Sequence, residues 1–267
     1  GDVVRELADA CREEGLKFAV YLSPWDRNHP KYGDEEYIDY FRNQLRELLT
    51  NYGEIFEVWF DGANGGDGWY GGANEIRTID RTTYYQWPET YKLIRELQPE
   101  TVIWNDGGDR GDLQWVGTEA GNVGETNWSL LYKTGDTSYP MLHYGLENGD
   151  AWVPAETNTS IRPGWFYHEP ENEHVKSLSK LMDTYYKSVG RNSTLLLNFP
   201  IAPNGRIHPN DSLRGIFSTI FQEHFSLTTT QLGLIVTASY IGNLVFLLVG
   251  GNLSTRFSKK RVLQVLI

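Results

Sequence analysis

The 267-residue sequence has a single cysteine, Cys11, so it cannot form an internal disulfide bond. Basic residues are fewer than acidic ones, so that the net charge is −11, and Lys and Arg do not cluster before Arg256. This shortage argues against nucleic acid as a partner. The sequence also has no initiator methionine and no signal peptide, and it opens directly in a helical pattern. We therefore expect a fragment or a processed piece of a longer protein.

The end of the sequence has no acidic residue, and no residue between Ser226 and Thr255 carries a charge. Leu232–Leu253 is long enough to cross a bilayer core of roughly 30 Å. Four basic residues follow at once, which fits the positive-inside pattern. We expect a hydrophobic, membrane-type helical tail that associates with a membrane through 226–255. The alternative is a buried soluble helix, which usually shows a polar face at this length.

Aromatic residues are abundant, with nine Trp and sixteen Tyr. Aromatic rings commonly stack on sugar rings, but they also serve as core packing, so both interpretations stay open. The chain is about 40% hydrophobic, which is enough for one large core.

Helical and strand patterns alternate along the first part of the chain, which predicts an α/β fold with parallel strands and right-handed crossovers. Residues 106–170 are rich in loop signals and are left unassigned. Asn210-Asp211-Ser212 offers an N-cap for a final helix. The other expected elements are helices near 4–11, 34–51, 88–97 and 172–189 and strands near 16–22, 55–60, 101–104 and 195–197.

Asp61 follows the apolar strand at 55–60 and precedes a Gly-rich loop. Loops at the carboxyl ends of parallel strands carry the chemistry in barrel and open α/β folds. An aspartate that only caps a turn is the alternative. If Asp61 is the nucleophile of a retaining glycosidase, a second carboxyl must lie about 5–5.5 Å away. Glu119 is the first candidate, and Glu125 and Asp106 are its rivals.

Four motifs resemble glycoside hydrolase family 29, the α-L-fucosidases, and most closely the branch that acts on α-1,3/1,4-linked fucose. The resemblance covers about residues 1–214 in the order of the family. The motifs are Tyr21-Leu22-Ser23-Pro24-Trp25-Asp26-Arg27-Asn28-His29-Pro30, Trp59-Phe60-Asp61-Gly62-Ala63, Trp115-Val116-Gly117-Thr118-Glu119-Ala120-Gly121, and 186–192 leading to Asn198-Phe199-Pro200.

The resemblance implies that Asp61 is the nucleophile and Glu119 the general acid/base, with no metal and no organic cofactor. It also leaves Arg110 as a weaker candidate for holding fucose, whereas His168 is expected to be a solvated loop histidine. The side chains expected to bind the sugar are Tyr21, Trp25, His29, Trp59 and Trp165.

The family's barrel begins upstream of this chain, and its early strands bring paired histidines that this sequence lacks. We therefore expect a partial (β/α)8-type barrel, missing its first strands, in residues 1–215. Residues 216–267 are expected to be a separate transmembrane helical fragment. Within it, Gly251–Arg261 resembles the loop between the second and third helices of major facilitator transporters, although Thr255 and Ser258 depart from that pattern.

The expected function is retaining hydrolysis of terminal α-1,3/1,4-linked L-fucose from a fucosylated oligosaccharide or glycoconjugate, by double displacement. The missing strands weaken the expectation that this chain itself turns over substrate. The resemblance implies a secreted or periplasmic parent enzyme. Two alternatives remain: a non-catalytic module that binds fucose or glycans, and a membrane-protein fragment whose soluble part is incidental.

Overall fold

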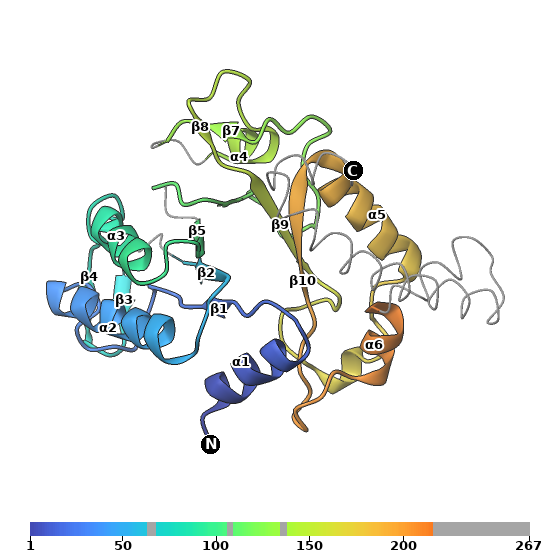
Figure 1. Cartoon of the computed structure of the whole chain (residues 1–267), viewed down its shortest axis with the longest axis horizontal. Coiled ribbons are helices and arrows are strands. Elements are labelled where there is room, and N and C mark those ends of the chain that lie inside the picture. Colours follow the sequence, from blue (N-terminus) through green and yellow to red (C-terminus); the bar gives the residue numbers. More distant parts are fainter. Residues whose placement is uncertain (63–67, 106–108, 134–137, 216–267) are drawn as a thin grey trace, which may run out of the picture. The chain divides into compact units, whose positions relative to one another are not determined.

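The computed structural model describes residues 1–62, 68–105, 109–133 and 138–215 (Figure 1). The chain divides into two compact units. The first consists of Gly1–Thr159 and Thr184–Leu197, and the second of Ser160–Asp183 and Asn198–Ile267.

The helices are α1 (Val3–Glu13), α2 (Glu35–Asn51), α3 (Trp87–Leu97), α4 (Tyr139–Tyr144), α5 (Leu178–Ser188) and α6 (Pro209–Gly215), with short 3₁₀ turns η1 (Glu169–Glu171) and η2 (Val189–Arg191). The strands are β1 (Val20–Tyr21), β2 (Glu57–Phe60), β3 (Gly68–Tyr70), β4 (Glu75–Arg77), β5 (Val102–Asn105), β6 (Gln114–Trp115), β7 (Leu130–Leu131), β8 (Ala151–Trp152), β9 (Ala155–Ser160) and β10 (Ser193–Asn198).

Parallel strands form the centre of the first unit. β1, β2 and β5 pair side by side in parallel, and β6 pairs in parallel with β9, which neighbours β10. A parallel bridge between Trp104 and Leu113 joins the two groups. The paired strands β1, β2, β5, β6 and β9 thus run in one direction, and their carboxyl ends lie at one edge, as in part of a (β/α) barrel.

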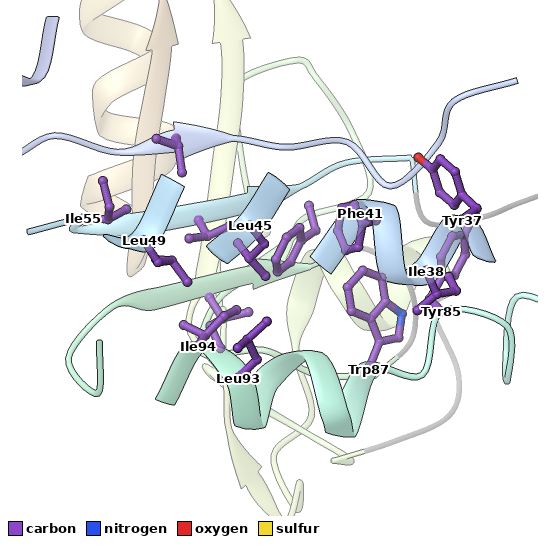
Figure 2. Close-up of a cluster of buried hydrophobic side chains, with 14 of the residues drawn as sticks. Tyr37, Ile38, Phe41, Leu45, Leu49, Ile55, Tyr85, Trp87, Leu93 and Ile94 are labelled. Carbon is purple, nitrogen blue, oxygen red and sulfur yellow. The ribbon is translucent and has the colours of Figure 1, made fainter. Parts of the chain in front are cut away.

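Helices α2 and α3 cover one face of β2 and β5 (Figure 2). The apolar residues of α2 recur at helical spacing, so that Tyr37, Phe41 and Leu45 form one buried stripe. The Phe60 ring lies 5.7 Å from that of Phe41 and 5.2 Å from that of Trp87 in α3. Each buried side chain of this size contributes about 1.5–3 kcal/mol, so this packing holds β2 in place.

Side chains alternate along β2, so Val58 and Phe60 face the helices while Glu57 and Trp59 point to the opposite face. On this second face, Trp104 of β5 is the register partner of Trp59 and its ring stacks on the Trp59 ring. The residue after β2, Asp61, continues the second face at the edge where the parallel strands end.

Several predicted boundaries were wrong. The strand expected near 16–22 is reduced to Val20–Tyr21, and the helix expected from 172 begins at Leu178. The Gly-rich stretch before Tyr84 contains the antiparallel pair β3–β4. The described residues of the unassigned stretch 106–170 contain the strands β6 to β9, with the fully buried β9 among them, the helix α4 and the start of η1. The sequence of β9, Ala-Glu-Thr-Asn-Thr-Ser, has no apolar alternation that would reveal a strand.

The second unit is centred on a buried ion pair. The Arg162 Nε atom lies 2.7 Å from Asp211 Oδ2, and both side chains are fully buried. Arg162 also donates to the carbonyl of His168 and to Asn172 Oδ1, at 3.1 and 2.8 Å. Asp211 therefore does not cap a helix as predicted, because α6 already begins at Pro209 and the carboxylate pairs with Arg162. The pair holds both ends of the segment 162–172.

Across the described residues, no helix has both the length and the apolar character needed to cross a membrane. The predicted membrane-type tail, 216–267, lies outside the described residues.

Candidate active site

Asp61 lies at the carboxyl end of β2, and Tyr21 at the end of β1. The parallel register sets Tyr21 beside Trp59, two residues before Asp61. From there the Tyr21 hydroxyl donates a hydrogen bond of 2.7 Å to Asp61 Oδ2. The Ser23 hydroxyl donates to the backbone carbonyl of Asp61, also at 2.7 Å. The half-buried carboxylate is thus oriented through both its side chain and its backbone.

Trp25 lies directly against Gly62, the residue after Asp61. A Cβ atom added at Gly62 would sit 3.1 Å from the Trp25 ring, and the glycine has φ +84°, a conformation that side chains rarely adopt. Trp25 is 42% exposed, and the Arg27 guanidinium lies 5.2 Å from its ring centre. The structure therefore places an exposed aromatic ring against the residue that follows Asp61.

The Trp59 indole lies on the same face as Asp61 and is surrounded by three defined contacts. It stacks on Trp104, with ring centres 3.8 Å apart, and lies 5.6 Å from the Tyr21 ring. Its Nε1–H donates a hydrogen bond of 2.8 Å to Glu156 Oε1. Tyr21, Trp59 and Asp61 thus form one continuous cluster.

Glu57 and Glu156 are buried carboxyls on this face that the sequence analysis missed. Burial, and then the charge of Glu156, raise the pKa of Glu57 from 4.5 to about 8. Burial also raises the pKa of Glu156, against the smaller opposing effect of hydrogen bonds from Trp59 and Thr194. The alternation Glu57-Val58-Trp59-Phe60-Asp61 could have revealed Glu57, because it puts three polar or aromatic side chains on one face.

Glu119 is exposed on the loop that follows β6. Two glycines with positive φ shape this loop, Gly117 at +82° and Gly121 at +71°, and the Thr118 hydroxyl accepts a bond from the Ala120 amide. A Cβ atom at Gly121 would lie 2.8 Å from side-chain atoms of Thr159 and Thr184. Because β6 is parallel to its neighbours, Glu119 and Asp61 follow strand ends at the same edge of the sheet.

Of the two rival acids, one lies beside an arginine and the other lies outside the described residues. Glu125 is exposed, and its Oε1 lies 3.5 Å from the Arg191 guanidinium. Asp106 lies outside the described residues.

The remaining candidates have contacts elsewhere. The His29 ring stacks on Tyr40 of α2, with centres 4.4 Å apart, and its described contacts are not with Asp61. Arg110 donates to the Tyr132 carbonyl at 3.3 Å. Trp165 belongs to the second unit, where its carbonyl accepts a hydrogen bond of 2.9 Å from Asn198. His168 is exposed, as predicted.

A comparison with protein-family models matches residues 1–215 to the model described as Alpha-L-fucosidase. The chain belongs to the alpha-L-fucosidase family. Alpha-L-fucosidase 1 of Arabidopsis thaliana is 40% identical over 270 residues, which cover 99% of this chain and 48% of the plant protein. The chain spans about half the length of the curated alpha-L-fucosidases it matches.

Solved structures show the same α/β fucosidase-like fold. A glycoside hydrolase 29 family member from an unknown rumen bacterium is 86% identical, with a TM-score of 0.78 over 82% of this chain and 40% of that one. A Ruminococcus gnavus GH29 fucosidase in complex with fucose is 29% identical, with a TM-score of 0.66 over 80% of this chain and 46% of that one. These alpha-L-fucosidase relatives confirm the predicted family, whereas no relative named here is a transporter.

Within the described ranges, no three His, Cys, Asp or Glu side chains gather into a group that could hold a metal ion.

Proposed function

We propose that this chain carries the catalytic residues of a retaining α-L-fucosidase, with Asp61 as nucleophile and Glu119 as general acid/base. The observation that carries the proposal is the Asp61 carboxylate at a strand's carboxyl end, oriented by the Tyr21 hydroxyl at 2.7 Å, in a chain of this family. In barrel enzymes this edge of the sheet holds the chemistry.

Two displacements complete the proposed reaction. In the first, an Asp61 oxygen bonds to the anomeric carbon of fucose while the glycosidic bond breaks and Glu119 gives its proton to the leaving oxygen. In the second, Glu119 takes a proton from water, whose oxygen bonds to the anomeric carbon as the bond to Asp61 breaks. Fucose leaves with its original anomeric configuration, and both carboxyls return to their starting states.

The fucose pocket is proposed to be walled by Tyr21 and Trp59, with Trp25, His29 and Trp165 completing it. The contact of Trp25 with Gly62 and the packing of Trp59 against Tyr21 support the first three roles. For His29 and Trp165 the proposal depends on the family resemblance of their motifs.

The substrate is proposed to be a terminal α-1,3/1,4-linked fucose on an oligosaccharide or glycoconjugate, and the parent enzyme to be secreted or periplasmic. Both statements depend on the resemblance to one branch of the family. Parallel digestion of α-1,2-, α-1,3-, α-1,4- and α-1,6-fucosylated oligosaccharides tests the linkage.

An aryl α-L-fucoside assay on the full chain tests the function. We expect the wild type to turn over the substrate and Asp61→Ala to lose at least a thousandfold of that activity. Proton NMR should show the α anomer of L-fucose as the first product released. In Glu119→Gln we expect a large loss of hydrolysis rate with a natural leaving group and a smaller loss of rate with an activated aryl leaving group. Turnover that survives Asp61→Ala would remove Asp61 from its role, and inversion at the anomeric carbon would exclude the double displacement.

A non-catalytic module that binds fucosylated glycans is the second candidate. It is favoured by the exposed aromatic rings of Trp25, Trp69 and Trp152, which are 42%, 57% and 74% exposed. Such a module would bind a fucosylated oligosaccharide in calorimetry, would not cleave it, and would keep its affinity in Glu119→Gln.

The segment 216–267 is proposed to be a membrane-type fragment related to transporters, on the strength of its uncharged stretch 226–255 and the cations that follow. Flotation of the full chain with liposomes, compared with a chain ending at Gly215, tests this. Equal recovery of both chains in the soluble fraction would contradict it.

A further inference from the structure

Glu156 is a buried carboxyl to which neither the sequence motifs nor the proposed reaction gives a role. It lies in β9 and is 5% exposed. Its Oε1 accepts the Trp59 indole N–H at 2.8 Å, and its Oε2 lies 3.3 Å from the Thr194 hydroxyl of β10. One side chain therefore links β9 and β10 to β2, the strand that Asp61 follows.

Burying a carboxyl is costly unless hydrogen bonds replace the lost water. An apolar residue would fill this interior position without that cost. The carboxyl is instead placed so that each of its oxygens meets a donor from a different strand. We take this arrangement to indicate a function that an apolar side chain could not supply.

Stacking on Trp104 alone does not fix the position of the Trp59 indole. Its broad face rests on Trp104 with an interplanar angle of 23°, and a stacked pair of this kind permits sliding and rotation within the ring plane. The bond from Nε1 to Glu156 removes that freedom, because it fixes the one polar atom of the ring. Trp59 in turn precedes Asp61 by two residues on the same face of β2.

We propose that Glu156 is a positioning residue that fixes the Trp59 indole as a wall of the fucose pocket beside Asp61. The part of this proposal that concerns fucose rests on the proposed function. The part that concerns the indole does not, and the two parts are measured separately.

The indole is followed by NMR on the full chain labelled with ¹⁵N at the tryptophan side chains, with the Trp59 signal assigned by its loss in Trp59→Phe. In the wild type we expect slow hydrogen exchange at this position, with the exposed indole of Trp152 as the fast internal reference. Glu156→Ala should shift the Trp59 signal and speed its exchange at least tenfold. Glu156→Gln keeps an acceptor oxygen and should restore slow exchange.

Fucose binding is measured by titrating the same samples with L-fucose. Glu156→Ala should raise the dissociation constant about tenfold, which corresponds to 1.4 kcal/mol, and Glu156→Gln should stay within about threefold of the wild type. Glu57→Ala is the matched control, since it also removes a buried carboxyl from this face but leaves the bond to Trp59 in place. Its Trp59 signal should stay near that of the wild type.

The outcomes separate cleanly. Exchange at Trp59 as fast as at Trp152 in the wild type would overturn the proposal, even if Glu156→Ala did not fold. An unchanged Trp59 signal in Glu156→Ala, or a displaced indole with unchanged fucose affinity, would also overturn it. If the wild type bound no fucose, the proposed function would fail, and the indole measurement would still decide whether Glu156 positions Trp59.

Discussion

Replacement of Glu57 by Gln should change how the stability of the chain depends on pH. The pKa of Glu57 is raised from 4.5 to about 8, first by burial and then by the charge of Glu156. Between these pH values the folded chain holds a proton at Glu57 that the unfolded chain has released. The free energy of unfolding therefore falls as pH rises through this window and levels off above pH 8.

The size of the effect follows from the slope of linkage, about 1.4 kcal/mol per pH unit for one proton. From pH 5 to pH 8 Glu57 should remove up to about 4 kcal/mol from the free energy of unfolding. A glutamine has no proton to lose in this window. The stability of Glu57→Gln relative to the wild type should thus rise by up to about 4 kcal/mol across the same interval.

Urea unfolding, followed by tryptophan fluorescence at pH 5, 6, 7 and 8, measures this difference. Glu100→Gln is the matched control, because Glu100 is an exposed glutamate in the same unit and should give curves parallel to those of the wild type. A difference between Glu57→Gln and wild type that stays constant from pH 5 to pH 8 would refute the assignment of a neutral carboxyl at Glu57.

Three further substitutions test other parts of the structure. Tyr21→Phe removes the hydroxyl bound to Asp61 and should lower kcat on an aryl fucoside about tenfold to a hundredfold. The Tm should change little because the Tyr21 side chain is 58% exposed, and an unchanged kcat would contradict the orienting role. Gly62→Ala forces a Cβ atom against the Trp25 ring at φ +84°. It should lower the free energy of unfolding in urea by about 1–3 kcal/mol and change the fluorescence of Trp25. Unchanged stability and fluorescence would show that the Gly62–Trp25 contact is loose. Asp211→Ala leaves the Arg162 charge buried alone and should lower the free energy of unfolding by about 3–5 kcal/mol. Most of this loss should be recovered when Arg162→Met is added. A loss below about 1 kcal/mol in the single variant would contradict the burial of the pair.

Helices α2 and α3 and strands β2 and β5 were predictable because their apolar residues follow a clear period and Gly or Pro marks their ends. The same pattern located Asp61 at a strand's carboxyl end, and the structure confirms that position. The hydrogen bond from Tyr21 was not predictable, since it depends on the register between β1 and β2.

The buried Glu156 was not predictable for a different reason. Glu156 belongs to a strand of polar residues, and local sequence patterns do not distinguish a polar buried strand from a loop. Its burial depends on partners in β2 and β10, which are far away in the sequence. The catalytic role of Glu119 and the sugar-binding roles of His29 and Trp165 stay predictions.

Strand β9 is buried along its whole length although five of its six side chains are polar. Its neighbour β10 supplies matching groups: the Thr157 hydroxyl donates to the Thr194 carbonyl at 2.6 Å, and the Thr157 amide donates to the Ser193 hydroxyl at 3.1 Å. Chimaeras assembled from two related enzymes should therefore tolerate a crossover before β9 better than one between β9 and β10. A crossover between them would bring together donors and acceptors that were never selected as a set.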